Sequence, residues 1–238
     1  MQSVLDLLFP PQCVCCGAAV ADAHALCAAC WLRTPFIAGL ACDLCGAPLP
    51  GRQMGDAEYC DACLTAPPPW QRGRAAMVYD GAVRDMVLAL KHADRLDLVR
   101  PMAGWMARAA QPLVVPGMIV APVPLHWTRL IRRRYNQSAL LARAVARGLG
   151  LDQCPDLLRR VRRTASQDHR GREERFANLR GAIDINVRRR DLVAGRPVLL
   201  IDDVMTTGAT LGVATHACLK GGASAVFVLV LARVAKDA

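Results

Sequence analysis

A short apolar run that leads into two adjacent carboxylates is the feature that most constrains the fold of this chain. The run Val198–Ile201 suits a strand buried on both faces, as parallel strands in α/β proteins are. Asp202 and Asp203 follow directly, and burying them without partners would be very costly. We therefore expect both acids at the carboxyl end of this strand, where open α/β sheets bind ligands.

The turn after the two acids has the composition of a phosphate site. It consists of Met205, Thr206, Thr207, Gly208, Ala209 and Thr210, called the threonine turn below. Its hydroxyls and its glycine precede an apolar run over 211–219 that predicts a helix, and the free amides at a helix start suit a phosphate. The alternative is that the acids are ordinary loop residues and the threonines only cap the helix.

Residues 198–210 resemble the signature of type I phosphoribosyltransferases, whose fold binds 5-phosphoribosyl-1-pyrophosphate (PRPP). The resemblance implies that Asp202 and Asp203 hold the ribose hydroxyls at the catalytic centre and that the threonine turn wraps the 5-phosphate. It also implies Mg²⁺, which would bridge pyrophosphate and ribose oxygens while the acid pair binds the hydroxyls directly or through water.

Four Cys-x2-Cys pairs lie in the first part of the chain. They are Cys13 and Cys16, Cys27 and Cys30, Cys42 and Cys45, and Cys60 and Cys63. The spacing suits two compact tetrahedral zinc sites, and these should be structural because no histidine stands at knuckle spacing. We expect sequential pairing, with the first two pairs on one ion, although crossed pairing also fits. A disulfide framework would require export, and residues 1–12 lack the features of a signal peptide.

Length and composition predict a two-part cytoplasmic protein of 238 residues. Three consecutive prolines within 64–72 form a stiff connector, so we expect a cysteine-rich zinc-binding domain at 1–66 and a second domain at 67–238. In the second part, strand-like runs at 77–79, 118–123, 157–158, 198–201 and 224–231 alternate with helix-like runs at 83–90, 96–110, 139–149 and 208–220. This alternation is typical of a parallel sheet with right-handed crossovers. No apolar stretch is long enough to span a bilayer, so we expect no membrane insertion.

The positive charge is concentrated in one segment. Of the net charge of +10, residues 129–196 supply the whole excess, since they carry 18 arginines and 7 acids. Such a segment predicts a phosphorylated ligand, nucleic acid, or both. A merely solvated basic face is the alternative.

Two further segments, 122–142 and 163–183, are similar to motifs of the ComF competence-protein family, which joins cysteine knuckles to a phosphoribosyltransferase domain. The implied fold class is α/β, a parallel-sheet type I phosphoribosyltransferase-like domain with a small N-terminal double zinc-ribbon domain. The family motif commonly reads Arg-Gly-aromatic-Asn-Gln, whereas here Arg134 replaces the glycine. Arginine does not readily adopt φ > 0, so either this turn is conventional or Arg134 compensates with a ligand contact.

Two loops should complete the site. The loop after the strand 118–123 would open at the same sheet edge as Asp202, with Arg133 on pyrophosphate and with Asn136 and Gln137 holding the loop; a solvated arginine is the alternative. The resemblance also implies a mobile loop that closes over the site, for which a plain surface hairpin is the alternative. Its residues are Thr164, Gln167, Arg175 and Asn178.

Two functions are compatible with these features. The ComF resemblance implies a protein that binds PRPP or another phosphorylated ligand and handles single-stranded DNA during DNA uptake, beside a helicase-like partner. Few aromatics are placed for base stacking: Tyr135, Trp127 and Trp70. The alternative is an active phosphoribosyltransferase that displaces pyrophosphate from PRPP with a nitrogenous base in nucleotide salvage, although no general base is evident. A zinc scaffold without a ligand would leave the motif from Asp202 to Thr210 unexplained.

Overall fold

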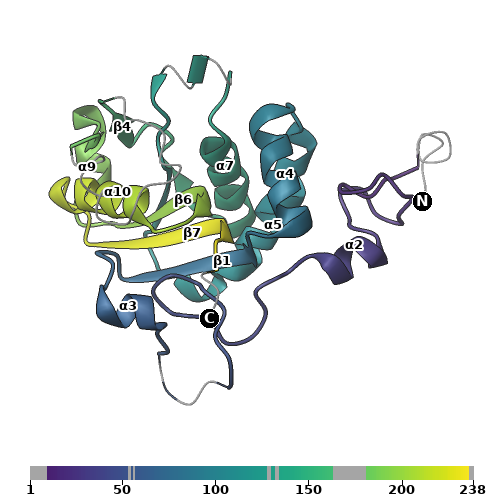
Figure 1. Ribbon diagram of the computed structural model, residues 1–238. Helices are drawn as coiled ribbons and strands as arrows, with labels where there is room; N and C mark the ends of the chain where they lie inside the picture. Colours follow the sequence, from purple (N-terminus) through teal and green to yellow (C-terminus); the bar gives the residue numbers. More distant parts are fainter. Residues whose placement is uncertain are drawn as a thin grey trace.

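The computed structural model describes residues 10–52, 55, 57–127, 130–131, 134–162 and 181–235 (Figure 1). Its centre is a five-stranded, wholly parallel sheet in the order β1-β7-β6-β2-β3. The strands are β1 (Arg72–Val78), β2 (Ile119–Pro122), β3 (Asp152–Gln153), β6 (Pro197–Met205) and β7 (Ala225–Arg233). The apolar runs predicted at 198–201 and 224–231 are thus the two central neighbours β6 and β7, as their continuous hydrophobicity indicates.

Helices and other elements cover both faces of the sheet. One face packs against α4 (Gly81–His92), α5 (Val99–Ala110) and α7 (Gln137–Leu149), and the other against α10 (Ala209–Lys220). Alternate residues of β6 supply the two cores, with Leu199 and Ile201 on one side and Val198 and Leu200 on the other. Short elements complete the chain: η1 (Leu96–Leu98), η2 (Gln111–Leu113), η3 (Val187–Arg189) and α9 (Arg190–Val193).

Two details differ from the pattern read along the sequence. The strand expected at 77–79 begins earlier, at Arg72. The strand expected near Leu158 is β4 (Leu158–Arg160), but it pairs antiparallel with β5 (Ile183–Ile185) outside the main sheet. This hairpin flanks residues 163–180, which lie outside the described part of the chain.

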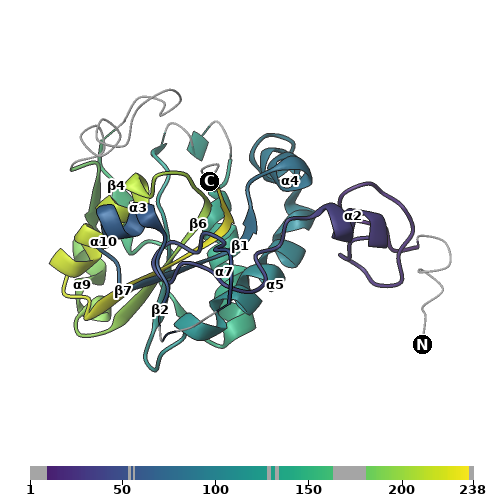
Figure 2. The same cartoon turned by 60° about the horizontal axis from the view of Figure 1, so that its bottom comes forward.

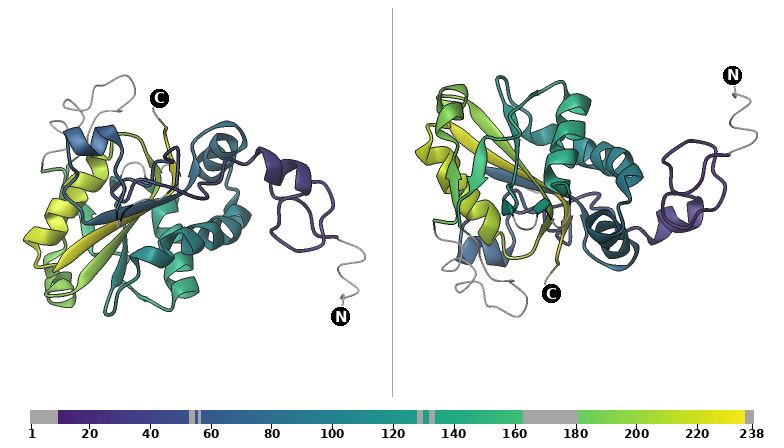
Figure 3. Two further views of the ribbon diagram at one scale, coloured as in Figure 1. Left: turned by 90° about the horizontal axis from the view of Figure 1, so that it is seen from below. Right: turned by 90° about the horizontal axis from the view of Figure 1, so that it is seen from above.

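The cysteine pairs form two modules that lie differently on the sheet domain. The first cysteine module (residues 10–33) contains α2 (Ala28–Arg33) and stands to one side of the sheet in every view (Figures 1, 2 and 3). It contacts the region before α5, where the Arg95 guanidinium donates to the Val14 carbonyl over 3.2 Å. The second cysteine module (residues 40–66), with α3 (Asp61–Thr65), lies against the edge strand β1.

Hydrogen bonds attach the connector and the second cysteine module to β1. The Val78 amide donates to the Pro35 carbonyl over 2.9 Å, and the Gly73 amide donates to the Asp43 carbonyl over 2.8 Å. The buried Asp43 carboxylate pairs with Arg72 at 2.7 Å and Arg74 at 2.6 Å, both from β1. An exposed edge strand offers unpaired backbone groups. In this protein the connector and the second cysteine module pair with those groups of β1. Backbone bonds therefore cross the boundary expected between 66 and 67, and the division into two domains stays a prediction.

The described helices include none that is both long enough and apolar enough to cross a membrane.

Replacing Gly73 by alanine should loosen the second cysteine module from β1. An added Cβ would meet the Leu44 carbonyl and lie 2.7 Å from Val228 Cγ2, so the backbone would have to shift. We expect the free energy of unfolding, measured by denaturant titration of the zinc-loaded protein, to fall by about 1–3 kcal/mol.

Gly104→Ala is the matched control, because a Cβ there, on helix α5, would meet nothing within 4 Å. That variant should be as stable as the parent or more stable by up to about 1 kcal/mol, since alanine is the better helix former. Equal stability of the two variants would contradict the packing described above.

Candidate functional site

The acid pair lies near the carboxyl end of β6, between β7 and β2. Asp203 is buried, at 6% exposed, and both of its carboxylate oxygens have protein partners. Lys91 Nζ lies 3.1 Å from Oδ1, and Gln137 Nε2 donates to Oδ2 over 2.9 Å. Asp203 therefore joins β6 to α4 and α7, and its partner Lys91, in the last turn of α4, was not anticipated from the sequence.

Asp202 is only partly buried and is less fully engaged. Its Oδ1 accepts hydrogen bonds from Ser138 Oγ and from the Asp203 amide, both at 2.9 Å. Its Oδ2 has no hydrogen bond to any described residue. Burial, together with the adjacent charge of Asp203, raises the pKa of Asp202 to about 7. Of the two acids, Asp202 is therefore the one that can bind a ligand without losing a protein contact.

The motif after β2 arranges the start of α7 beside this acid pair. Asn136 is the N-cap of the helix, accepting from the Ser138 amide at 3.0 Å, and its Nδ2 donates to the Val123 carbonyl at 3.1 Å. Gln137, at 3% exposed, points to Asp203 as described. Both residues therefore hold the loop to the sheet, as expected. Their expected contact with a phosphorylated ligand stays a prediction. Ser138 was missed, although its place directly after Asn136 and Gln137 was the available signal.

Arg134 adopts a left-handed backbone conformation, with φ of 64°. The turn therefore has the positive φ that glycine adopts far more readily than arginine, and the conventional turn is excluded. The next residue, Tyr135, anchors the turn because its hydroxyl donates to the Leu90 carbonyl over 2.6 Å. A non-glycine residue with positive φ is strained, and such strain is concentrated at functional turns.

The threonine turn joins β6 to α10 and is supported from below by Arg233. Gly208, at φ of 78°, is the N-cap of α10, and the Thr207 hydroxyl accepts from the Ala209 amide over 3.4 Å. Arg233, at the end of β7, is buried and donates to the carbonyls of Met205 at 3.1 Å and of Thr206. The amides of Thr207, Gly208 and Thr210 make no hydrogen bond to a described residue, so they are available to a ligand. No local sequence pattern pointed to Arg233.

Trp70 covers the other side of the turn. A Cβ built on Gly208 would lie 2.8 Å from Cη2 of the Trp70 ring, so the indole packs directly over this glycine. The Trp70 Nε1–H group donates to the Leu44 carbonyl in the second cysteine module over 2.5 Å. Trp70 is 5% exposed and is a packing residue rather than a stacking platform for a base.

Several expected site residues lie outside the described part of the chain. Arg133 is one of them, and the residues expected in the mobile loop are the others: Thr164, Gln167, Arg175 and Asn178.

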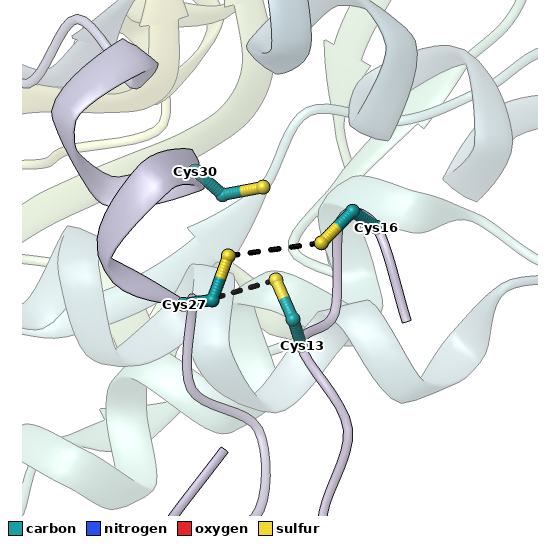
Figure 4. Close-up of side chains that lie close together, drawn as sticks. All are labelled: Cys13, Cys16, Cys27 and Cys30. Atoms are coloured by element: carbon teal, nitrogen blue, oxygen red, sulfur yellow. Dashed lines mark hydrogen bonds between the residues drawn. The ribbon is translucent and has the colours of Figure 1, made fainter. Parts of the chain in front are cut away.

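The eight paired cysteines form two clusters, with the sequential pairing expected. Within each cluster the four sulfurs lie within 4.8 Å of one another. The four sulfurs of the first cluster point toward a common centre, two from a loop and two from the start of α2 (Figure 4). Two sulfur–sulfur distances, 3.7 Å for Cys16 and Cys27 and 3.6 Å for Cys45 and Cys60, match the roughly 3.8 Å of a tetrahedron with zinc–sulfur bonds of about 2.3 Å. Crossed pairing is excluded, and these cysteines are free thiols rather than disulfides.

One thiol in each cluster has a lowered pKa. A hydrogen bond from the Cys45 thiol and backbone amide bonds lower the pKa of Cys42 to about 4. Burial opposes ionisation of Cys13, but amides that include that of Cys27 outweigh it and lower the pKa of Cys13 to about 6. The pKa of Cys45 is raised, mainly because Cys42 beside it ionises first, and the nearby Arg233 opposes that rise. Zinc binds thiolates, so both clusters have a donor available at neutral pH.

Comparison with known proteins agrees with this arrangement. The double zinc ribbon domain family matches residues 4–64. A "DNA utilization protein YhgH" of Salmonella typhimurium is 32% identical over 234 residues, which cover 95% of this chain and 99% of that protein. "Competence protein F" of Haemophilus influenzae is 29% identical over 198 residues, which cover 81% of this chain and 84% of that protein. The chain belongs to the ComF family.

Solved structures, among them the two that follow, are similar to part of this ComF family member. A glutamine PRPP amidotransferase of Bacillus subtilis is 17% identical over 55% of this chain, with a TM-score of 0.37, and the match spans 25% of the enzyme. A hypoxanthine phosphoribosyl transferase of Trypanosoma cruzi is 13% identical over 63% of this chain and 66% of its own, with a TM-score of 0.31. The parallel α/β fold class with an N-terminal double zinc ribbon, expected from the sequence, is confirmed.

Asp202→Asn should change how stability depends on pH. Folding raises the pKa of Asp202 from 3.8 to about 7, so ionisation of this group disfavours the folded state as pH rises toward 7. The cost is about 1.4 kcal/mol per unit of pKa difference. Asparagine keeps the Oδ1 acceptor but cannot ionise.

The stability of Asp202→Asn relative to the parent should therefore increase between pH 5 and pH 7 and become constant above about pH 8, where Asp202 is ionised in both the unfolded and the folded parent. Denaturant titrations of both zinc-loaded proteins across this range would measure it, because pH effects at the cysteine clusters cancel in the difference. A difference that is constant across the range would show that Asp202 does not titrate as described.

Proposed function

We propose that this ComF family member binds a phosphorylated ribose, such as PRPP, and handles single-stranded DNA during DNA uptake. The observation that supports the sugar site best is the position of Asp202 beside the threonine turn. A carboxylate with an unused oxygen lies on the strand that leads into the turn, and the amides of Thr207, Gly208 and Thr210 in this turn make no hydrogen bond to a described residue. A ribose 5-phosphate needs both features at once, since its hydroxyls donate and its phosphate accepts.

Within this proposal, the phosphate binds at the start of α10 and Asp202 binds a ribose hydroxyl. Asp203 does not act as an equal partner, because both of its oxygens already have protein donors. The unused oxygen of Asp202 also makes the site suitable for Mg²⁺. Asp202 Oδ2 offers a carboxylate oxygen of the kind that Mg²⁺ prefers, and a bound ion would offset the negative charge of a pyrophosphate group.

The DNA role is supported by the relatives' names, "DNA utilization protein" and "Competence protein", and by the surface beside the site. Trp127, in the loop after β2, is 63% exposed and is available to stack on a base. Exposed arginines on described elements of the basic segment, including Arg134 and Arg188, can contact backbone phosphates. We further propose that the protein acts in the cytoplasm beside a helicase-like competence protein.

Trp127→Ala should weaken single-stranded DNA binding about 5- to 100-fold, because stacking on an aromatic ring contributes about 1–3 kcal/mol per base. Trp127→Phe is the matched control and should retain most of the affinity. Fluorescence anisotropy with a labelled oligonucleotide would measure the dissociation constants.

The affinity of the parent should also fall steeply between 50 and 200 mM salt, with a smaller slope after arginine-to-alanine changes in 129–134. An affinity that does not change with salt would refute DNA binding through the basic segment.

An active phosphoribosyltransferase is the second candidate, and the same acid and turn favour it. The reaction would displace pyrophosphate from the anomeric carbon of PRPP by a nitrogen nucleophile through a transition state with oxocarbenium character. Asp202 would orient the ribose through its hydroxyls, and the turn would hold the 5-phosphate. The identity of the base determines whether this chemistry serves nucleotide salvage.

Pyrophosphate release from PRPP and Mg²⁺ by the zinc-loaded protein, offered pooled nucleobases, distinguishes the two candidates. An active enzyme should release pyrophosphate, and Asp202→Asn should lower the rate at least tenfold while the fold is retained. Asp202→Asn suits this test better than a change at Asp203, whose loss would also break the contacts to Lys91 and Gln137. No release in any mixture would reject the enzyme and leave the binding protein.

A further inference from the structure

The second cysteine module and the threonine turn contact a common side chain. Trp70 donates its Nε1–H group to the Leu44 carbonyl, inside the Cys42–Cys45 knuckle, and its ring lies on Gly208 of the turn. The same indole therefore touches the backbone of both structures. It is almost fully buried in a cluster that also holds Met205, the first residue of the turn, and cysteines of the second module.

Arg233 holds the threonine turn from the adjacent strand β7. Its guanidinium donates to the Met205 and Thr206 carbonyls and to the carbonyl of its neighbour Val234. These bonds fix the first residues of the turn, whereas Trp70 connects the turn to the second cysteine module.

The first cysteine module has no such connection in the described structure. Its contacts are with the region around α4 and α5, through Val14 and Arg95 for example, and it stands away from β6 and α10 in all views (Figures 1 to 3). The two clusters have the same ligands and similar geometry. The first cluster is therefore an internal control. Loss of metal there should unfold its own module but should not affect the threonine turn.

We propose that metal binding at the second cysteine cluster supports the threonine turn, so that zinc affinity and anion affinity are coupled through Trp70. This inference rests on the proposed function of the turn as a phosphate site. When zinc holds the Cys42–Cys45 knuckle, the Leu44 carbonyl is fixed and orients the indole over Gly208. When the metal leaves, the knuckle loses its closure and the indole loses its acceptor, so the turn is no longer held in the conformation that presents its amides.

Coupling of this kind must be reciprocal. If loss of zinc from the second cluster weakens anion binding tenfold, saturating anion must tighten zinc binding there by the same factor. The first cluster should show neither effect. Trp70 and Arg233 are positioning residues in this scheme, since each acts on the ligand only through the backbone of the turn.

The first experiment needs no ligand and measures hydrogen exchange across 205–210 in the full chain. Cys60→Ser and Cys16→Ser each remove one of the more exposed ligands from the second and first clusters. Exchange in the turn should become faster in Cys60→Ser and stay unchanged in Cys16→Ser. Unchanged exchange in Cys60→Ser, or equal acceleration in both variants, would overturn the proposal.

Trp70→Phe tests the connection while all eight metal ligands remain, so it is informative even if Cys60→Ser fails to fold. Phenylalanine keeps a ring near Gly208 but cannot donate to the Leu44 carbonyl. Trp105→Phe is the matched control, because Trp105 is also buried but packs against Phe36. Exchange across 205–210 should increase only in Trp70→Phe, and an unchanged rate in that variant would overturn the role of Trp70.

Calorimetric titration with ribose 5-phosphate then measures the coupling itself. Its affinity should fall about tenfold in Cys60→Ser and about three- to tenfold in Trp70→Phe, and by less than twofold in the two controls. Saturating ribose 5-phosphate should also slow zinc transfer to a chromogenic chelator from the second cluster alone. If the parent binds neither ribose 5-phosphate nor inorganic phosphate, the phosphate site is rejected, whereas the exchange rates still decide whether the second cluster holds the turn.

Discussion

The ion pair between Asp203 and Lys91 is the interaction on which the arrangement of the site depends. A buried carboxylate on the central strand β6 is costly unless it is paired, and removing one partner of such a pair typically costs about 3–5 kcal/mol. Here the pair, completed by Gln137, joins the strand to two helices, α4 and α7, that begin far apart in the sequence. Asp202 and Ser138 are placed as a consequence, because each is the direct neighbour of a residue in this network.

This arrangement divides two adjacent acids between different tasks. Successive side chains of a strand point to opposite faces, so Asp203 is buried against the helices and Asp202 is partly open at the strand end. A signature that reads as two equivalent ribose ligands thus contains one acid with a structural role and one available to a ligand. Burial, and after it the adjacent charge of Asp203 that the fold requires, raises the pKa of Asp202.

The edge of the sheet is the second organising constraint. β1 would expose unpaired backbone groups, and the connector and the second cysteine module cover them through main-chain bonds and the buried Asp43 carboxylate. The two similar cysteine clusters therefore differ in consequence. One belongs to a module that stands to the side of the sheet, whereas the other lies within a core cluster shared with Trp70 and Met205. Its proximity to the threonine turn follows from covering this edge.

The sequence by itself determined the parallel sheet, the strands β6 and β7, the helices α4, α7 and α10, and the clustered cysteines. Each depends on periodicity or spacing over a few residues, which local physics controls. Tertiary structure decided which cysteine module lies beside the site. It also decided that Asp203 forms an ion pair with Lys91 and that Arg233 and Trp70 support the threonine turn. It further decided that Arg134 adopts a left-handed backbone conformation, with Tyr135 anchored on α4. These features depend on contacts between residues far apart in the chain, and no local pattern specifies which distant partner a buried polar group will find.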